Sequence, residues 1–515
     1  MQRKYLIAFI IVCVPTEAFA LEQQEGAGYG AALVAGDFDC DGRADLAVGV
    51  PYQTVDGFTD TGAVHIWYGA NPFGGKFVGG NHSFSQASAG VPAVPEDNDN
   101  FGSVLAAGNF DNDGCDDLVI GTPFESIGTN NDAGVVHVMY GGTSGLSTNG
   151  IGYFHQDSPG IAGAPGTNDR FGSALAAGDF NDDGYDDLAI GVYGERVDDV
   201  FDAGQVHILY GGSSGLTTTG NQIFNQSTQG IVDIVESGDH FGITLAVGNF
   251  AGAAAEDLAI GITGENSSAG AVAILRGSTT GLTVTSSEFW TQNSANVANS
   301  SQDGDHFGYA LASGNFNADG FDDLAIGVPF EKIGTIVGAG AVHTFHGASG
   351  GMTPVGFFSQ DTTNINGVAE ADDYLGWSLA TGDFDIDGRD DLAIGVPWED
   401  ADGHDDAGAI NVLYGSSSGI STNDDELFHQ GVSGVSEFVY GHIEANDRFG
   451  WALTAGAFFN SFGEPSLAAS AMYESVQGVS YSGMVNVMAY GGQTYNGGLA
   501  VWADWQDDNT QQPLD

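Results

Sequence analysis

The chain of 515 residues is strongly acidic, with 68 Asp and Glu against 10 Lys and Arg and a formal net charge of −58. That charge excludes general binding to nucleic acids or anionic membranes, because both need clustered basic residues on one surface. Its 81 glycines and its low share of charged residues, 15%, favour short strands joined by tight turns over long helices. We expect part of the acidity to bind metal, and the rest is compatible with a solubility adaptation to salty surroundings.

The first twenty residues differ from the rest of the chain. Arg3 and Lys4 precede an apolar run over residues 5–14, and small residues end the segment at 18–20. This pattern predicts a secretory signal peptide over residues 1–20, with the mature chain beginning near Leu21. An anchoring helix is disfavoured, because the run is about half of the roughly 20 residues needed to span a bilayer. We therefore expect a protein that is secreted or displayed at the cell surface, with the periplasm as an alternative.

One unit then repeats seven times. Aligned on an aromatic-Gly step, the repeats start near residues 29, 101, 171, 241, 307, 375 and 449, at spacings of 66 to 74 residues. Each holds four short apolar segments separated by Gly-rich turns, as at 171–180, 187–192, 204–211 and 223–226. Such strands cannot each bury a core alone, so the units must stack on copies of themselves. We predict an all-β fold, a seven-bladed β-propeller of four-stranded antiparallel blades over residues 21–515; an open β-solenoid, which has shorter repeats, is the competing architecture.

Two residue types recur in register without carrying an obvious site. His65, His137, His207 and His343 each lie 35 residues after the aligned glycine, with Asn411 in the sixth repeat. Because they fall in different blades, at the same place in the third strand, we expect them to be blade-packing residues and not to bind metal. Cys40 and Cys115 lie in equivalent loops of the first two repeats. Export permits a disulfide between them, but two cysteines make no disulfide scaffold; the sequence favours free thiols and leaves the pairing open.

Five repeats share a nine-residue loop between their first and second strands. Oxygen-bearing side chains stand at positions 1, 3, 5 and 9, glycine stands at position 6, and position 7 is expected to add its backbone carbonyl. Calcium takes roughly six to eight oxygen ligands and tolerates irregular geometry, and a curled loop with alternating acids supplies them. The candidate ligands, in order of position, are Asp37, Asp39, Asp41, Arg43 and Asp45; Asn109, Asp111, Asp113, Cys115 and Asp117; Asp179, Asn181, Asp183, Tyr185 and Asp187; Asn315, Asn317, Asp319, Phe321 and Asp323; Asp383, Asp385, Asp387, Arg389 and Asp391.

The alternatives to calcium in these loops are weaker. The spacing is similar to the start of an EF-hand but lacks its Glu at position 12 and its flanking helices. A plain polar turn would explain one loop, but not five copies in register. Magnesium demands tight octahedral geometry, and a metal saturated by one local loop leaves no open position for catalysis. We therefore predict about five structural calcium sites, and none in repeats four and seven, which carry Ala251, Ala253 and Ala255, and Ala457, Phe459 and Ser461, instead of ligands.

The repeat resembles a known family. An aromatic-Gly step at Phe101, Phe171, Phe241, Phe307 and Phe449, with Gly-x-Pro at 49–51, 121–123, 327–329 and 395–397, is similar to the FG-GAP repeat of the integrin α-subunit N-terminal propeller. The resemblance covers residues 29–515. It implies a seven-bladed propeller with calcium in hairpins on one face, ligand contacts on the other, and recognition at a cell surface or matrix. Without a membrane helix, a leg-like region or an inserted domain, the chain is expected to be a stand-alone exported member of the kind found in bacteria.

The face opposite the metal loops carries a recurring acid after the second strand: Glu125, Glu195, Glu265, Glu331, Glu399 and Glu474. We expect each to cap backbone amides of its own loop, with a cation- or glycan-binding ring as the alternative. A second set lies three residues before the aligned glycine and is expected to fix the interblade turn: Asp99, Asp169, Asp239, Asp305, Asp373 and Asp447. Recognition needs asymmetry, so the better candidates are Arg170, Arg196, Arg448, Trp398 and Trp451.

These features favour a non-enzymatic recognition or adhesion module for an extracellular protein or glycan. A glycan hydrolase or lyase on the central face is the first alternative, although the chain has no nucleophile elbow and no His-Glu-x-x-His site. A structural or assembly subunit is the second. The sequence leaves open whether residues 21–23 or residues 503–506 complete the seventh blade.

Overall fold

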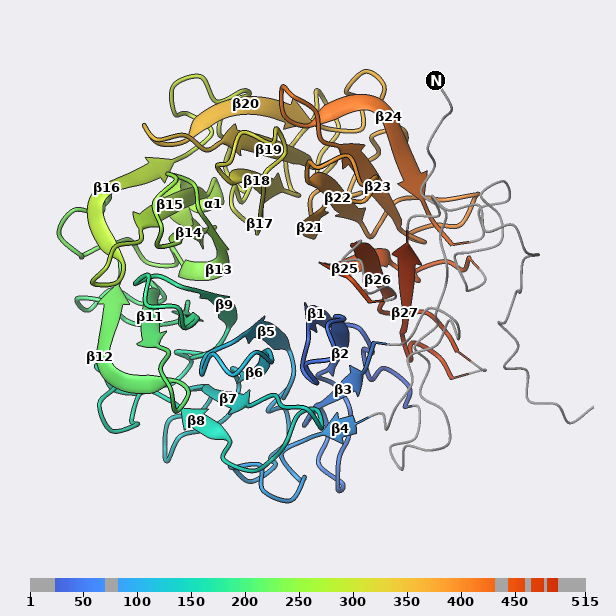
Figure 1. Cartoon of the computed structure of the whole chain (residues 1–515). Helices are drawn as coiled ribbons and strands as arrows, with labels where there is room; N and C mark the ends of the chain where they lie inside the picture. The colour runs from blue at the N-terminus through green and yellow to red at the C-terminus, as the bar shows by residue number, and fades with distance from the viewer. Residues whose placement is uncertain (1–23, 70–81, 431–442, 459–464, 477–478, 490–515) are drawn as a thin grey trace, which may run out of the picture.

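The computed structural model describes residues 24–69, 82–430, 443–458, 465–476 and 479–489 (Figure 1). Seven antiparallel sheets stand around a central axis, and in each the first strand lies nearest the centre. The predicted seven-bladed, all-β propeller is confirmed. The predicted signal peptide and both candidate closing segments of the seventh blade lie outside the described residues.

The strands follow one another along the chain in every blade. Blade one is β1 (Ala32–Gly36), β2 (Asp45–Val50), β3 (Ala63–Trp67) and β4 (His82–Phe84); blade two is β5 (Val104–Gly108), β6 (Asp117–Thr122), β7 (Val135–Met139) and β8 (Gly152–Phe154); blade three is β9 (Ala174–Gly178), β10 (Asp187–Val192), β11 (Gln205–Tyr210) and β12 (Thr217–Phe224). Blade four is β13 (Phe241–Gly248), β14 (Asp257–Ile262), β15 (Ala271–Arg276) and β16 (Thr283–Trp290); blade five is β17 (Ala310–Gly314), β18 (Asp323–Val328), β19 (Ala341–His346) and β20 (Thr353–Phe358). Blade six is β21 (Leu379–Gly382), β22 (Asp391–Val396), β23 (Ala409–Tyr414) and β24 (Ser421–Phe428), and the described part of blade seven is β25 (Phe449–Gly456), β26 (Ser466–Ala471) and β27 (Met484–Ala489).

The second strand of each blade is buried along its whole length, as in the run Asp-Leu-Ala-Ile-Gly-Val of β10. A run without alternation is typical of a strand covered on both faces, and here the neighbouring blades supply the cover. Seven hydrophobic clusters fill the seven junctions between blades. The last of them packs Phe458 and Val487 of blade seven against Leu46 and Val48 of blade one. The ring is therefore closed by packing between its first and last blades.

Two glycines of the repeat meet across each junction. Gly102 has φ +87°, which favours glycine, and its carbonyl oxygen lies where a side chain on Gly49 of the preceding blade would have to stand. The same pair recurs as Gly121 with Gly172 and as later pairs around the ring. Both glycines of the motif therefore serve the close approach of adjacent backbones.

The recurring histidines pack as the sequence predicts. His137 and His207 are fully buried, each edge-on to the aromatic ring of the Phe-Gly step, Phe101 and Phe171, with centroids 5.3 Å apart. Burial lowers the pKa of both histidines to about 4, so they are neutral at ordinary pH. They are structural residues of the blade.

Blade four departs from the pattern in one connection. The four residues of α1 (Glu265–Ser268) form a single helical turn after β14, and Asn266, Ser267 and Ser268 all have positive φ. No helix among the described residues has the length and apolar character needed to cross a bilayer.

Candidate metal loops and the opposite face

The five candidate metal loops are curled by two residues with positive φ. The glycine at position 6 has φ between 83° and 97°, as the sequence predicts. Position 4 is also left-handed, at 52° to 60°, even where it is Cys40, Ala318 or Ile386. Non-glycine residues adopt this conformation rarely, so the sequence did not indicate it. The curl turns the side chains of positions 1, 3 and 5 toward one another.

The loop's own backbone holds the side chain at position 1. The Asp37 carboxylate accepts hydrogen bonds from the amides of Asp41 at 3.0 Å and of Gly42 at 2.9 Å. Asp179 and Asp383 accept the equivalent pair of bonds. The first ligand position is thus set by the fold before a metal arrives.

Position 9 is a buried anchor at the start of the second strand. The two carboxylate oxygens of Asp45 accept from the amides of Phe38 at 2.8 Å and Gly69 at 2.7 Å, and Asp45 is fully buried. The same two bonds recur in the other four loops. Burial raises the pKa of this aspartate to about 8 in Asp45, Asp187 and Asp391 and to about 7 in Asp117 and Asp323. A nearby cation would keep these carboxylates ionised at neutral pH.

The residues present fit a calcium ion. One carboxylate oxygen from each of Asp37, Asp39 and Asp41, at positions 1, 3 and 5, lies within 4.8 Å of the others, and in blade six the carboxylates of positions 1, 3 and 9, Asp383, Asp385 and Asp391, lie equally close together. In blade three the buried amide oxygen of Asn181, at position 3, has no hydrogen-bond partner. The donors are hard oxygens, which calcium prefers. The structure thus brings predicted ligands together, while the carbonyl of position 7 remains a prediction.

Position 7 contributes something that the sequence analysis did not foresee. The Arg43 guanidinium pairs with Asp41, and Arg389 Nη1 lies 2.8 Å from Asp387 Oδ2. In blades one and six the acid at position 5 therefore forms an ion pair with an arginine of its own loop. The arginine compensates some of the charge that the loop accumulates.

Position 8 ties adjacent blades together on the metal-loop face. Asp116 of blade two accepts a hydrogen bond from the Asp37 amide of blade one at 2.8 Å, and its own amide donates to the Asp37 carbonyl at 2.9 Å. The same reciprocal tie joins the next four junctions through Asp186, Glu256, Asp322 and Asp390. Blade seven has Pro465 and blade one has Ala44 at this position, so the junctions on either side of blade seven lack the carboxylate.

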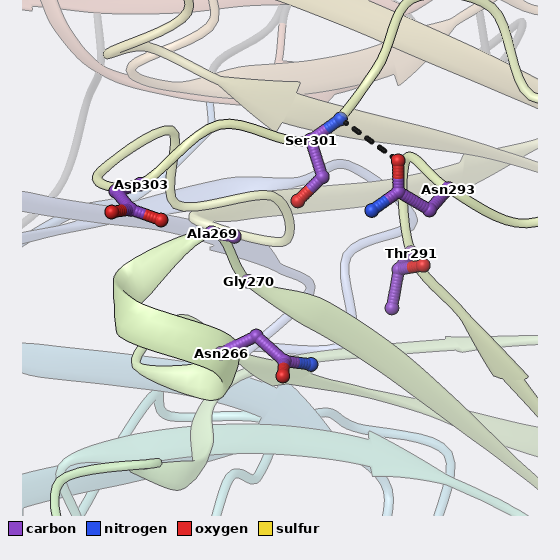
Figure 2. A pocket seen from close by; sticks show the side chains of 7 residues that line it. All are labelled: Asn266, Ala269, Gly270, Thr291, Asn293, Ser301 and Asp303. Carbon is purple, nitrogen blue, oxygen red and sulfur yellow. Dashed lines mark hydrogen bonds between the residues drawn. The ribbon is translucent and has the colours of Figure 1, made fainter.

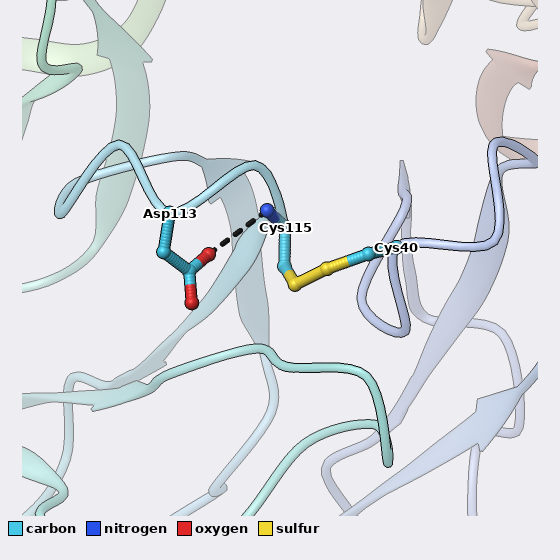
Figure 3. Close-up of side chains that lie close together, drawn as sticks. All are labelled: Cys40, Asp113 and Cys115. Carbon is cyan, nitrogen blue, oxygen red and sulfur yellow. Dashed lines mark hydrogen bonds between the residues drawn. A yellow bond between two sulfur atoms is a disulfide. The ribbon is translucent and has the colours of Figure 1, made fainter.

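A disulfide strengthens the first of these junctions (Figure 3). Cys40, at position 4 of the blade-one loop, is bonded to Cys115, at position 7 of the blade-two loop, with the Cα atoms 4.8 Å apart. The expectation of free thiols is therefore wrong. The two positions are not equivalent within their loops, and only the lateral contact of adjacent blades makes them neighbours.

Reduction of this disulfide, or Cys115→Ser, is expected to destabilise the protein. The bond closes a separation of 75 residues, for which the chain-entropy model gives about 4 kcal/mol. Urea unfolding with and without a reductant measures the difference, and the Cys115→Ser variant, which should not respond to reductant, is the control. Equal unfolding midpoints for oxidised and reduced wild type would refute the expectation.

On the opposite face, each recurring glutamate binds the preceding blade. Glu125 accepts a hydrogen bond from the side-chain amide of Gln86, the last residue of the blade-one repeat, at 2.5 Å. Five further glutamates have the same partner type, in the pairs Gln156–Glu195, Gln226–Glu265, Gln292–Glu331, Gln360–Glu399 and Gln430–Glu474. The sequence predicts caps of each glutamate's own loop, but the partner that all six share is the closing Gln of the neighbouring blade, and a backbone contact within its own loop is recorded for Glu331, with Lys332. Since five of the six are less than 9% exposed, they form no open ring for a cation or a glycan.

The recurring aspartates fix the interblade turn, as the sequence predicts. Asp99 accepts from the amide of Glu96 at 2.6 Å, and four equivalents do the same at 2.5 to 2.6 Å. Asp99 also lies beside Glu125, so two buried carboxyl groups share one junction. Burial and the neighbouring acid together raise the pKa of Glu125, and burial raises the pKa of Glu195, Glu331 and Glu399 to about 7.

Aromatic side chains cluster on this face in one sector of the ring. We call the following seven half-buried residues the aromatic sector: Tyr309, Phe330, Tyr374, Trp377, Trp398, Trp451 and Tyr473. They form an unbroken series of ring contacts across blades five, six and seven, with centroids 4.6 Å apart for Trp377 and Trp398 and 5.1 Å for Trp377 and Trp451. The residue before the recurring glutamate is Trp398 in blade six, whereas it is a glycine in blades three and four. The face is therefore asymmetric.

The three candidate arginines lie in different surroundings. The Arg448 guanidinium is 4.8 Å from the ring centroids of both Trp398 and Tyr473 and joins the aromatic sector. Arg170 lies between Phe124 of blade two and Tyr193 of blade three, outside the aromatic sector. Arg196 is exposed and pairs with Asp199 of its own loop. The structure thus brings Arg448, Trp398 and Trp451 together and leaves the other two arginines apart.

One polar pocket of about 280 Å³ lies beside α1 (Figure 2). Asn266 lines one side of it, and Thr291, Asn293, Ser301 and Asp303 line the other. The Ser301 amide donates to Asn293 Oδ1 at 3.3 Å. None of these residues was a predicted site residue, because the segment breaks the repeat.

Comparisons with known proteins agree with this architecture. The FG-GAP repeat family matches residues 29–67, 101–139, 171–209, 307–345 and 375–413. The two repeats it does not match are the fourth and seventh, which have lost the loop acids. The chain is 28% identical to Integrin alpha-PS2 of Drosophila melanogaster over 272 residues, 52% of this chain and 17% of the integrin, and 28% identical to Integrin alpha-5 of Xenopus laevis over 237 residues, 45% of this chain and 20% of that one.

Other similarities are shorter or weaker. Phosphatidylinositol-glycan-specific phospholipase D of Mus musculus is 33% identical over 137 residues, 26% of this chain and 15% of that protein. A rhamnogalacturonan lyase structure from Bacillus licheniformis has a TM-score of 0.37 and 10% identity, over 82% of this chain and 76% of that one. The chain matches 17% and 20% of the lengths of the two integrins.

Proposed function

This chain is an FG-GAP repeat protein with an integrin-α-like seven-bladed propeller, and from that premise we propose that it is a secreted, calcium-binding module that recognises an extracellular protein or glycan. The aromatic sector is the observation that supports this proposal most directly. Aromatic rings and arginine are enriched where protein surfaces bind partners, because they offer a large contact area with a polar handle. A sector confined to three blades gives the asymmetry that selective recognition needs.

Calcium has a structural part in the proposal. The five loops lie at the ends of the first strands of blades one, two, three, five and six, and blades five and six also carry most of the aromatic sector at their other ends. A bound ion would pin each hairpin and offset the repulsion among its acids. The loops would thereby hold the blades that carry the binding surface, without contacting the ligand.

The test of this function is binding by the aromatic sector. The double variant Trp398→Ala/Trp451→Ala is expected to lose about tenfold or more in affinity for whichever ligand the wild type binds, since central aromatic contacts dominate interface energies. Wild type and variant are screened against glycan arrays and a panel of extracellular matrix proteins in calcium. Phe201→Ala is the matched control, because Phe201 is an exposed aromatic residue outside the sector, 60% accessible.

Two outcomes would count against the proposal. If the wild type bound no glycan and no protein in either screen, the recognition function would fail. If the double variant bound as the wild type does, and its circular dichroism showed the same fold, recognition would have to use another surface.

A further inference from the structure

The loop of blade four keeps the aspartate of position 9, beside the interblade Glu256 of position 8, but has no acid at positions 1, 3 and 5. Asp257, at position 9, is 1% exposed and accepts hydrogen bonds from the amides of Gly277 at 2.9 Å and Ala251 at 3.1 Å. Positions 3, 5 and 7 are alanines. In the five metal loops the same buried aspartate stands among further oxygen ligands, whereas in blade seven Ser466 replaces it. The buried carboxylate of blade four therefore needs a source of positive charge other than a metal.

Arg276 supplies that charge from the neighbouring strand. Its Nη1 lies 2.8 Å from Asp257 Oδ2, its Nη2 pairs with Glu288, and the residue is 8% exposed. The equivalent position at the end of the third strand is Tyr68, Tyr140, Tyr210, His346 and Tyr414 in blades one, two, three, five and six. Among these six blades an arginine stands there in blade four alone, and blade four is also the one whose loop has the buried position-9 aspartate but no acid at positions 1, 3 and 5.

In two of the other blades the tyrosine at this position also makes a hydrogen bond to the next blade, and in blade four Arg276 and Glu288 together replace that bond. In blades one and two the Tyr68 and Tyr140 hydroxyls accept hydrogen bonds from the amides of Leu146 and Leu216 in the next blade, at 3.0 and 3.1 Å. In blade four the Glu288 carboxylate, held by Arg276, accepts the corresponding amide of Met352 at 3.1 Å. The pair thus preserves the junction between blades four and five.

We infer that the Arg276 guanidinium is a built-in cation that takes the place of calcium in blade four. It binds the position-9 carboxylate that a metal would otherwise neutralise and makes this blade independent of metal. The comparison with the other loops rests on the proposed calcium binding, whereas the pairing of Arg276 with Asp257 does not. In blade seven Ser466 stands at position 9, so this position carries no buried carboxylate for a cation to neutralise.

The first experiment needs no metal. Arg276→Tyr, which installs the residue of blades one, two, three and six, is expected to lower the melting temperature by the same several degrees in calcium and in chelator, because it leaves the buried Asp257 and the partly buried Glu288 without their cation. Adding Asp257→Ser, the residue of blade seven, should recover most of that loss. Arg196→Gln, at an exposed arginine, is the control and should not change the melting temperature. If Arg276→Tyr melted as the wild type does in chelator, the inference would be overturned.

The second experiment restores a metal loop. Ala251→Asp, Ala253→Asp and Ala254→Gly rebuild positions 3, 5 and 6, and Asn249 already holds position 1. With Arg276 in place the rebuilt loop is expected to leave the calcium stoichiometry of the wild type unchanged, whereas adding Arg276→Tyr should raise it by one ion, as counted by calorimetry. An extra ion bound with Arg276 in place would contradict the inference. No calcium bound by the wild type would instead contradict the calcium proposal, and the melting experiment on Arg276 would still decide the role of that residue.

Discussion

Removal of calcium is expected to lower the melting temperature of this protein more than any single substitution. Each occupied loop stabilises the folded state by about 2.7 kcal/mol when free calcium is a hundredfold above its dissociation constant, and the chain carries five intact loops. The metal also relieves repulsion among acids such as Asp37, Asp39 and Asp41, which lie within 4.8 Å of one another. Thermal scans in calcium and in chelator measure the effect, and calorimetry should count about five sites.

Single-loop variants provide the internal control for the calcium count. Asp39→Ala and Asp319→Ala are each expected to remove one ion from the stoichiometry and to lower the melting temperature in calcium but not in chelator. Ala253→Ser, in the loop of blade four, should change neither quantity. A wild-type count near zero, or a melting temperature that does not respond to chelator, would refute the assignment of these loops to calcium.

The second large effect is a loss of stability as the pH rises from about 4 to about 7. Burial raises the pKa of Glu195, Glu331 and Glu399 to about 7, above the unperturbed value near 4.3. Between these values the folded protein holds protons that the unfolded chain has lost, so stability falls as pH rises, by about 1.4 kcal/mol per pH unit for each such group. Six junctions carry the motif, and their contributions act in the same direction. With calcium saturating, the melting temperature is therefore expected to fall as the pH rises from about 5 through 7 and above.

The pair Glu125 and Asp99 allows this pH dependence to be tested at one junction. Glu96 adds a third carboxylate, Gln86 donates to Glu125, and the Tyr153 hydroxyl faces the same two acids. Glu125→Gln removes one charge and is expected to raise the melting temperature at pH 8 more than at pH 5. Glu25→Gln makes the same change at an exposed position and serves as the control. A Glu125→Gln variant that was destabilised equally at both pH values would show that the carboxylate is needed in its ionised form.

The sequence predicted most of the architecture, because a repeat in register constrains every blade at once. The count of blades, the strand order, the packing of His137 and His207, and the grouping of Asp37, Asp39 and Asp41 all follow from residues at fixed distances from the Phe-Gly step. Aromatic residues outside the repeat pattern, Trp398 and Trp451, were likewise recognisable as candidates by their asymmetry. All of these features can be recognised from the residues within each repeat, without knowledge of how neighbouring repeats contact one another.

The features that the sequence did not reveal lie between repeats. Glu125 has its partner Gln86 in the preceding blade, Asp116 binds the backbone of the preceding blade, and Cys40 meets Cys115 across a junction. Aligning repeats compares equivalent positions, whereas these contacts join positions that are not equivalent. They depend on the rotation of one blade against the next, which only the structure shows.

The carboxylate ties of position 8 run around only part of the ring. Five consecutive junctions have a tie, and the two beside blade seven, at Pro465 and at Ala44, do not. Among the described residues, the position-8 carboxylates therefore link blades one to six into a continuous arc, and blade seven joins that arc through other contacts, which include the bond from the Ala44 amide to the Ala457 carbonyl at 3.1 Å.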